Sequence, residues 1–97
     1  MTFNEIIEQE KPTLVDFYAE WCGPCKWFEP TLDELGNRVG DKATILKIDV
    51  DLEQELVKRF KIKSVPTLVI FKGGEIRWRQ VGAFPVNELE RLIKENL

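Results

Sequence analysis

The strongest constraint on the fold of this chain is the order in which strand and helix patterns follow one another. Residues 12–18 form a short apolar run typical of a buried strand, and residues 22–38 carry apolar side chains at the three- and four-residue steps of an amphipathic helix. Residues 43–50, rich in Ile and Val, predict a second buried strand, and residues 52–60 a short helix capped by Asp51. A strand, helix, strand, helix order predicts an α/β fold with a parallel strand pair.

The second half of the chain predicts a hairpin and a closing helix. Residues 67–72 and 75–81 are strand-like and are separated by Gly73-Gly74, a tight hairpin signal. Pro85 opens a last helix whose apolar face is Val86, Leu89, Leu92 and Ile93. With a short helix over residues 2–9, the pattern predicts a mixed sheet covered by helices.

Length and charge indicate one soluble globular domain. The 97 residues are 43% hydrophobic and 32% charged, with no repeat or linker-like stretch, so we expect a single domain over residues 1–97. A net charge of -3 provides no basic field, so neither a nucleic acid nor a membrane is an expected partner. The first ten residues lack the pattern of a signal peptide, and we expect a cytoplasmic location.

The chain has two cysteines, Cys22 and Cys25, in the stretch Trp-Cys-Gly-Pro-Cys-Lys. A structural bridge across so short a loop would contribute only about 2 kcal/mol. A structural zinc site needs four Cys or His ligands, and the chain has no histidine; a c-type haem needs His at the position of Lys26. No metal site is therefore expected. The interpretation that remains is thiol-disulfide exchange, for which a C-x-x-C between strand and helix is a typical context.

The placement of the two sulfurs predicts their roles. Cys22 stands at the N-terminus of the predicted helix, where free backbone N–H groups favour a thiolate, so it is the expected nucleophile. Cys25 lies one turn into the helix, is expected to be less accessible, and would be the resolving thiol. Gly23-Pro24 between them fits the first helical turn and favours a reductant over an oxidant.

The segment from Val15 to Lys26, the helical Pro30, the Val65-Pro66-Thr67 turn and Val81-Gly82 closely resemble the thioredoxin family in order and spacing. The resemblance runs from about residue 12 to the C-terminus. It implies a thioredoxin fold with three α/β/α layers and four helices. Only a short helix precedes the first strand, so the family's usual first strand is missing and about four strands are expected.

The resemblance also implies a protein-disulfide reductase that acts as a general cytoplasmic electron donor to disulfide-containing proteins. No cofactor would be bound, and a flavin-containing thioredoxin reductase would regenerate the dithiol with electrons from NADPH. The protein is expected to be a monomer. By position, Asp16 resembles the family's buried carboxylate beneath the cysteines, a proton relay for Cys25, and Lys47 the lysine beside it. The alternative for Asp16 is a strand aspartate satisfied by a local hydrogen bond.

The substrate-docking surface is likewise implied by the resemblance. Pro66 would be a cis proline, and the Val65 backbone would pair with an extended substrate, as in β-augmentation. The surrounding apolar surface would consist of Trp21, Gly23, Pro24, Val50, Val65, Val81 and Gly82.

Three aromatic residues depart from the family pattern. Tyr18 stands where a second tryptophan is common, and Trp27 and Trp78 replace smaller residues, which we interpret as packing or surface contacts. Two other functions stay open at this point. One is a thiol oxidase or isomerase of the same fold, and the other is a non-catalytic binding module.

Overall fold

The computed structural model describes residues 1–97 and contains one sheet with the strand order β2-β1-β3-β4. Strand β1 (Thr13–Tyr18) pairs in parallel with β2 (Thr44–Asp49). On its other side β1 pairs antiparallel with β3 (Thr67–Lys72), which forms an antiparallel hairpin with β4 (Glu75–Val81). The mixed sheet, its four strands and the parallel pair predicted from the sequence are confirmed.

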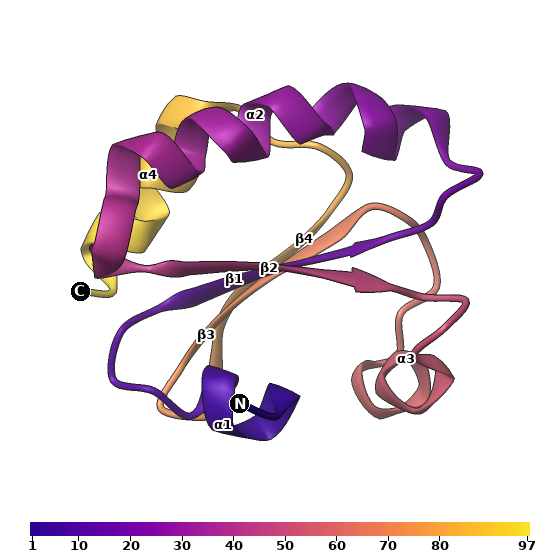
Figure 1. Ribbon diagram of the computed structural model, residues 1–97, viewed down its shortest axis with the longest axis horizontal. Helices are drawn as coiled ribbons and strands as arrows, with labels where there is room; N and C mark the ends of the chain where they lie inside the picture. The colour runs from indigo at the N-terminus through magenta and orange to yellow at the C-terminus, as the bar shows by residue number, and fades with distance from the viewer.

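Four helices cover the sheet. They are α1 (Phe3–Ile7), α2 (Gly23–Val39), α3 (Gln54–Phe60) and α4 (Val86–Glu95), with a 3-10 turn, η1 (Gly40–Lys42), after α2. In Figure 1, α2 and α4 lie on one face of the sheet, and α1 and α3 lie on the other. The three α/β/α layers are confirmed. None of the helices combines the length and the apolar character that crossing a membrane requires.

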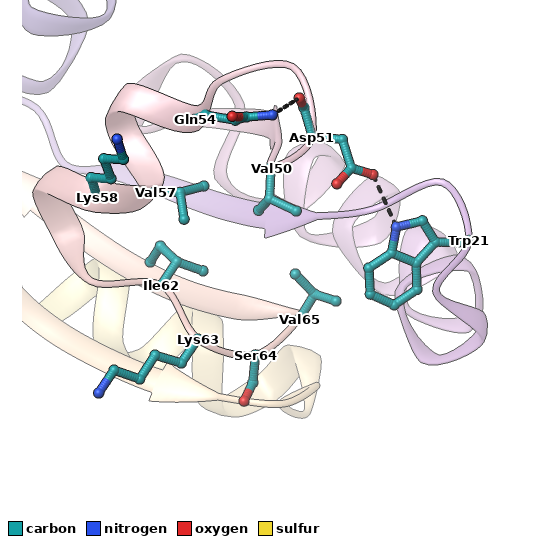
Figure 2. A pocket seen from close by; sticks show the side chains of 10 residues that line it. All are labelled: Trp21, Val50, Asp51, Gln54, Val57, Lys58, Ile62, Lys63, Ser64 and Val65. Carbon is teal, nitrogen blue, oxygen red and sulfur yellow. Dashed lines mark hydrogen bonds between the residues drawn. The ribbon is translucent and has the colours of Figure 1, made fainter.

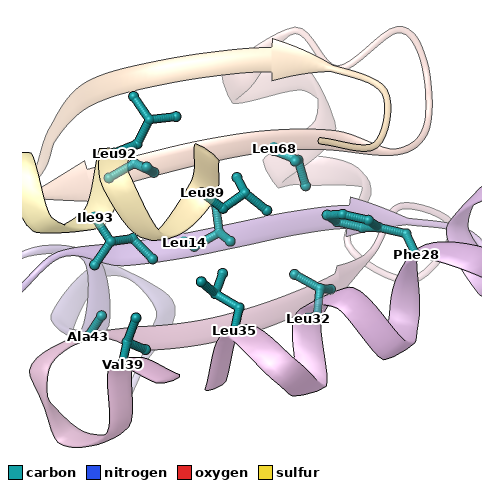
Figure 3. Close-up of a cluster of buried hydrophobic side chains, with 11 residues drawn as sticks. Leu14, Phe28, Leu32, Leu35, Val39, Ala43, Leu68, Leu89, Leu92 and Ile93 are labelled. Carbon is teal, nitrogen blue, oxygen red and sulfur yellow. The ribbon is translucent and has the colours of Figure 1, made fainter. Parts of the chain in front are cut away.

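Each face of the sheet has its own hydrophobic core, because successive side chains of a strand point to opposite faces. Leu14 of β1 and Leu68 of β3 are fully buried against α2 and α4 (Figure 3). Val15 and Phe17, the alternate residues of β1, belong to the core on the α1 and α3 face. Asp16 shares the face of Leu14, so its carboxylate lies on the side of the sheet that α2 covers.

The start of α3 differs from the prediction. The helix begins at Gln54, its N-cap is Glu53 with no side-chain capping bond, and Asp51 lies in the preceding turn. The Asp51 N–H donates to Asp49 Oδ1 at 2.8 Å, which forms that turn. Asp51 is therefore not the helix cap, because the turn places it three residues before the helix.

Candidate active site

Cys22 and Cys25 form a disulfide at the start of α2, with their Cα atoms 5.3 Å apart. Cys22 is the N-cap of the helix, and the Cys25 N–H donates a hydrogen bond to Cys22 Sγ over 3.2 Å. The first turn of a helix has backbone N–H groups without intrahelical partners, and the helix dipole makes this end positive. This geometry stabilises negative charge on the Cys22 sulfur when the disulfide is opened.

Both cysteines are buried in the disulfide form. Cys22 is 5% exposed and Cys25 is 3% exposed, and Ala19, Val50 and Val65 pack around them. Cys25 is the less exposed of the two, by a small margin in this form. The two sulfurs differ mainly in their hydrogen bonding.

The loop that faces the disulfide contains a cis peptide bond between Val65 and Pro66, as the resemblance implied. Val65 O lies 3.8 Å from Cys22 Sγ. The Gly82 N–H donates to Pro66 O at 2.7 Å, and Thr67 Oγ1 donates to Ser64 O at 2.6 Å. These bonds hold the loop against β3 and β4 and keep the Val65 carbonyl at the disulfide.

Of the other predicted docking residues, Val50 packs against the cysteines and Gly82 is hydrogen-bonded to this loop. Trp21 is 71% exposed immediately before Cys22, and Gly23 and Pro24 are exposed at the start of α2. Val81, 57% exposed, lies opposite Thr67 in the β3–β4 pair. Together with Val50, Val65 and Gly82, they give the disulfide a largely apolar rim.

Asp16 is fully buried, and neither of its carboxylate oxygens has a hydrogen-bond partner. Burial raises the pKa of Asp16 to about 6, because the charged carboxylate loses its hydration. The alternative of a locally hydrogen-bonded strand aspartate is contradicted, because both oxygens are unpaired. The residue has the pKa of a group that can exchange protons near neutral pH.

Lys47 is the cross-strand neighbour of Asp16 in the β1–β2 pair, but its ammonium is bound elsewhere. Its Nζ lies 3.3 Å from Glu29 Oε1 and 4.4 Å from the centre of the Tyr18 ring. Burial has the largest effect on the pKa of Asp16. The charge of Lys47 lowers this pKa by a smaller amount, and the charge of Glu29 raises it. Glu29, which the sequence analysis did not single out, therefore belongs to the electrostatics of the site.

Comparison with known proteins agrees with this geometry. The family model for thioredoxin matches residues 1–95. A thioredoxin of Bacillus subtilis is 44% identical over 88 residues, which cover 91% of this chain and 85% of that protein.

The chain belongs to the thioredoxin family.

A chloroplastic thioredoxin Y of rice (Oryza sativa subsp. japonica) is 43% identical over 97 residues, or 99% of this chain, and the chain spans 58% of that relative's length. The solved structure of a mutant thioredoxin from Halobacterium salinarum NRC-1 superposes with a TM-score of 0.86 at 36% identity, over 96% of this chain and 80% of that one. The thioredoxin fold is confirmed. Family membership and the Cys22–Cys25 pair together make the chain a protein-disulfide reductase.

A groove beside the disulfide is a feature of this thioredoxin-family chain that the sequence analysis missed. It has a volume of about 370 Å³ and lies between α3, the loop after β2 and the loop before β3 (Figure 2). It is lined by Trp21, Val50, Asp51, Gln54, Val57, Lys58, Ile62, Lys63, Ser64 and Val65. The Trp21 indole Nε1–H donates to Asp51 Oδ2 at 2.9 Å, which joins the loops that follow the parallel strands β1 and β2.

Two tryptophans that depart from the family pattern have different surroundings. Trp78 packs on Phe84 with ring centres 5.2 Å apart, at the edge of the core under α4. Trp27 is 82% exposed on α2. No group of three or more Cys, Asp or Glu side chains is arranged to hold a metal ion.

Proposed function

We propose that the reductase acts with Cys22 as nucleophile and Cys25 as resolving thiol. The Cys22 thiolate attacks one sulfur of a target disulfide; the new S–S bond forms as the target S–S bond breaks, and the other target sulfur leaves as a thiolate. The observation that carries this assignment is the hydrogen bond from the Cys25 N–H to Cys22 Sγ at the N-cap of α2. Cys25 has no corresponding contact from a helix terminus.

In the second step Cys25 loses its proton and attacks Cys22 Sγ. This closes the Cys22–Cys25 disulfide and releases the second target thiolate, so that two electrons pass to the target. Asp16 accepts the Cys25 proton, directly or through a water molecule, because it lies on the face of the sheet beneath α2 with both oxygens free. The positive charge of Lys47, on the neighbouring strand, lowers the pKa of Asp16.

The target segment binds across the cis-Pro66 loop and the apolar rim of the disulfide. Val65 supplies backbone groups for pairing with an extended segment, and Trp21, Gly23, Pro24, Val50, Val81 and Gly82 supply apolar contacts.

The protein acts as a monomeric single domain over residues 1–97 and as a cytoplasmic electron donor to many disulfide-containing proteins. A flavin-containing thioredoxin reductase returns it to the dithiol with electrons from NADPH.

Replacement of each cysteine tests the assignment of roles. Cys22→Ser should abolish reduction of insulin by dithiothreitol, whereas Cys25→Ser should attack the target once and remain bound to it as a mixed disulfide. Mass spectrometry of the reaction with a disulfide peptide distinguishes the two. Faster alkylation of Cys25 than of Cys22 in the native dithiol would reverse the assignment.

The redox potential separates a reductase from an oxidase or isomerase of the same fold. We expect a value near that of other reducing members of the family, about -270 mV. Oxidising relatives have potentials of about -180 to -120 mV. A potential in that range would overturn the proposal that the protein serves as an electron donor. A non-catalytic binding module would work equally well with both cysteines replaced by serine.

A further inference from the structure

The groove beside the disulfide is continuous with the reactive site. Val50 and Val65 line the groove and also pack against Cys22 and Cys25. In Figure 2, the apolar side chains of Val50, Val57, Ile62 and Val65 lie between Trp21 at one end and the lysines at the other. A target segment joined to Cys22 therefore has an apolar path that leads away from the sulfur.

The far end of the groove is basic. Lys58 and Lys63 line it, and the segment from residue 58 to 63 holds four cationic residues and no anionic one, in a chain whose net charge is -3. Lys58 and Lys63 are both exposed and take part in none of the ion pairs of the structure. Arg59, by contrast, is occupied by a hydrogen bond to Asn4. Two unpaired ammonium groups are thus available to an anionic partner.

The near end of the groove has the opposite character. The Asp51 carboxylate lines it and is fixed there by the hydrogen bond from the Trp21 indole. An acidic side chain beside the target cysteine would meet the Asp51 carboxylate, whereas the same side chain further along would meet the lysines.

We propose that this groove selects target proteins in which an apolar stretch beside the reactive disulfide leads to acidic residues further along, which pair with Lys58 and Lys63. This inference rests on the proposed function, because the segment must first be a substrate of Cys22. Because the two ends of the groove carry opposite charges, acidic residues far from the target cysteine are favoured over acidic residues next to it. Exposed charge pairs of this kind change association rates and preference between partners more than affinity.

A peptide series tests this preference in single-turnover reactions of the reduced protein. Each peptide carries one cysteine as a mixed disulfide with 2-mercaptoethanol, followed by apolar residues, with a glutamate pair moved stepwise away from the cysteine and a glutamine pair as the neutral reference. We expect the second-order rate constant of the best distal glutamate peptide to exceed that of its glutamine counterpart roughly three- to tenfold at low ionic strength. The gain should fall toward one in about 0.5 M salt.

A double substitution, Lys58→Gln with Lys63→Gln, should remove the preference, so that the ratio of the two rate constants falls to near one. The matched control, Lys42→Gln with Lys72→Gln, changes the net charge equally at lysines that do not line the groove and should keep the ratio. Equal rates for glutamate and glutamine peptides with the wild-type protein, or equal loss in both double variants, would overturn this inference alone. Failure to reduce any peptide, or bis(2-hydroxyethyl) disulfide, would overturn the proposed function and this inference with it.

Discussion

Asp16 and Lys47 illustrate how the surroundings of single side chains set the pKa of a buried carboxyl group. The two residues are aligned in the parallel β1–β2 pair, yet Lys47 Nζ is bound by Glu29 and lies over the Tyr18 ring. A direct ion pair would hold the pKa of Asp16 low. Burial without a hydrogen-bond partner instead raises that pKa to about 6, which suits a proton acceptor near neutral pH.

Glu29→Gln should lower the pKa of Asp16 below about 6. The substitution removes a negative charge that raises this pKa and frees Lys47 to approach the carboxylate, which favours its charged form. A pH titration of the Asp16 side-chain carbon by NMR measures the shift, and the pH profile of the resolving step should move in the same direction. Glu34→Gln, on the same helix but paired with Arg38, is the control. An unchanged Asp16 titration would show that Glu29 does not act on this carboxylate.

At the scale of elements, the end of β4 fixes the loop that faces the disulfide. Gly82 follows β4 with φ of 95°, a conformation that side chains with a Cβ rarely adopt, and its N–H donates to Pro66 O. Pro66 immediately precedes β3, so the Gly82 backbone connects the end of β4 to the loop before β3. The position requires glycine for its backbone angle and not for space, because a Cβ there would contact nothing within 4 Å.

Gly82→Ala should reduce the free energy of unfolding by about 1 to 2 kcal/mol, because alanine is strained at this positive φ. The strain should also loosen the Pro66 loop and slow the reduction of protein disulfides. Gly36→Ala, in the interior of α2, is the matched control and should raise stability by about 0.5 to 1 kcal/mol, since its Cβ meets one side-chain atom at an ordinary 3.7 Å. Urea unfolding of both variants measures these changes. Equal effects of the two substitutions would contradict the role given to the Gly82 backbone.

The elements that the sequence predicted well are those in which local signals suffice. Both strands of the hairpin begin and end where the pattern put them, because a Gly-Gly turn separates two clear strand runs. The predicted start of α3 was wrong because the Asp49 side chain accepts a hydrogen bond from the backbone and so forms a turn before the helix. The periodicity of apolar residues does not reveal such a bond. In the same way, the cysteine motif lies within a few consecutive residues and could be predicted from the sequence. Glu29 and Asp51, by contrast, contact the site from segments that are distant in the sequence.

At the scale of the whole molecule, the disulfide lies where the loops after two parallel strands meet. The loop after β1 leads to Cys22, and the loop after β2 holds Val50 and Asp51. Crevices at the carboxyl ends of parallel strands are common binding places in α/β folds. The buried residues include one carboxyl group, Asp16, among apolar side chains, so the proposed proton acceptor also affects the stability of the fold.

Asp16→Asn should separate that stability from the chemistry. The folded state holds the Asp16 proton more tightly than the unfolded state, with a pKa of about 6 against 3.8. The free energy of unfolding should therefore fall as pH rises from 3.8 to about 6, and above that it should remain lower by up to about 3 kcal/mol. The variant lacks this ionisation, so its free energy of unfolding should exceed that of the parent at pH 8. Below pH 3.8, the free energies of unfolding of the two proteins should depend on pH in nearly the same way.

The same variant should resolve a mixed disulfide more slowly, because Cys25 loses the acceptor for its proton. Urea unfolding from pH 4 to 9 gives the stability difference, and single-turnover release of a bound peptide gives the rate of resolution. Both halves follow from one cause, a carboxylate kept without hydrogen bonds in the core beneath α2. A variant that is less stable than the parent at every pH and resolves at the parental rate would show that Asp16 has a structural role alone. A stable but slow variant would mean that the fold gives up stability to keep a base beneath Cys25.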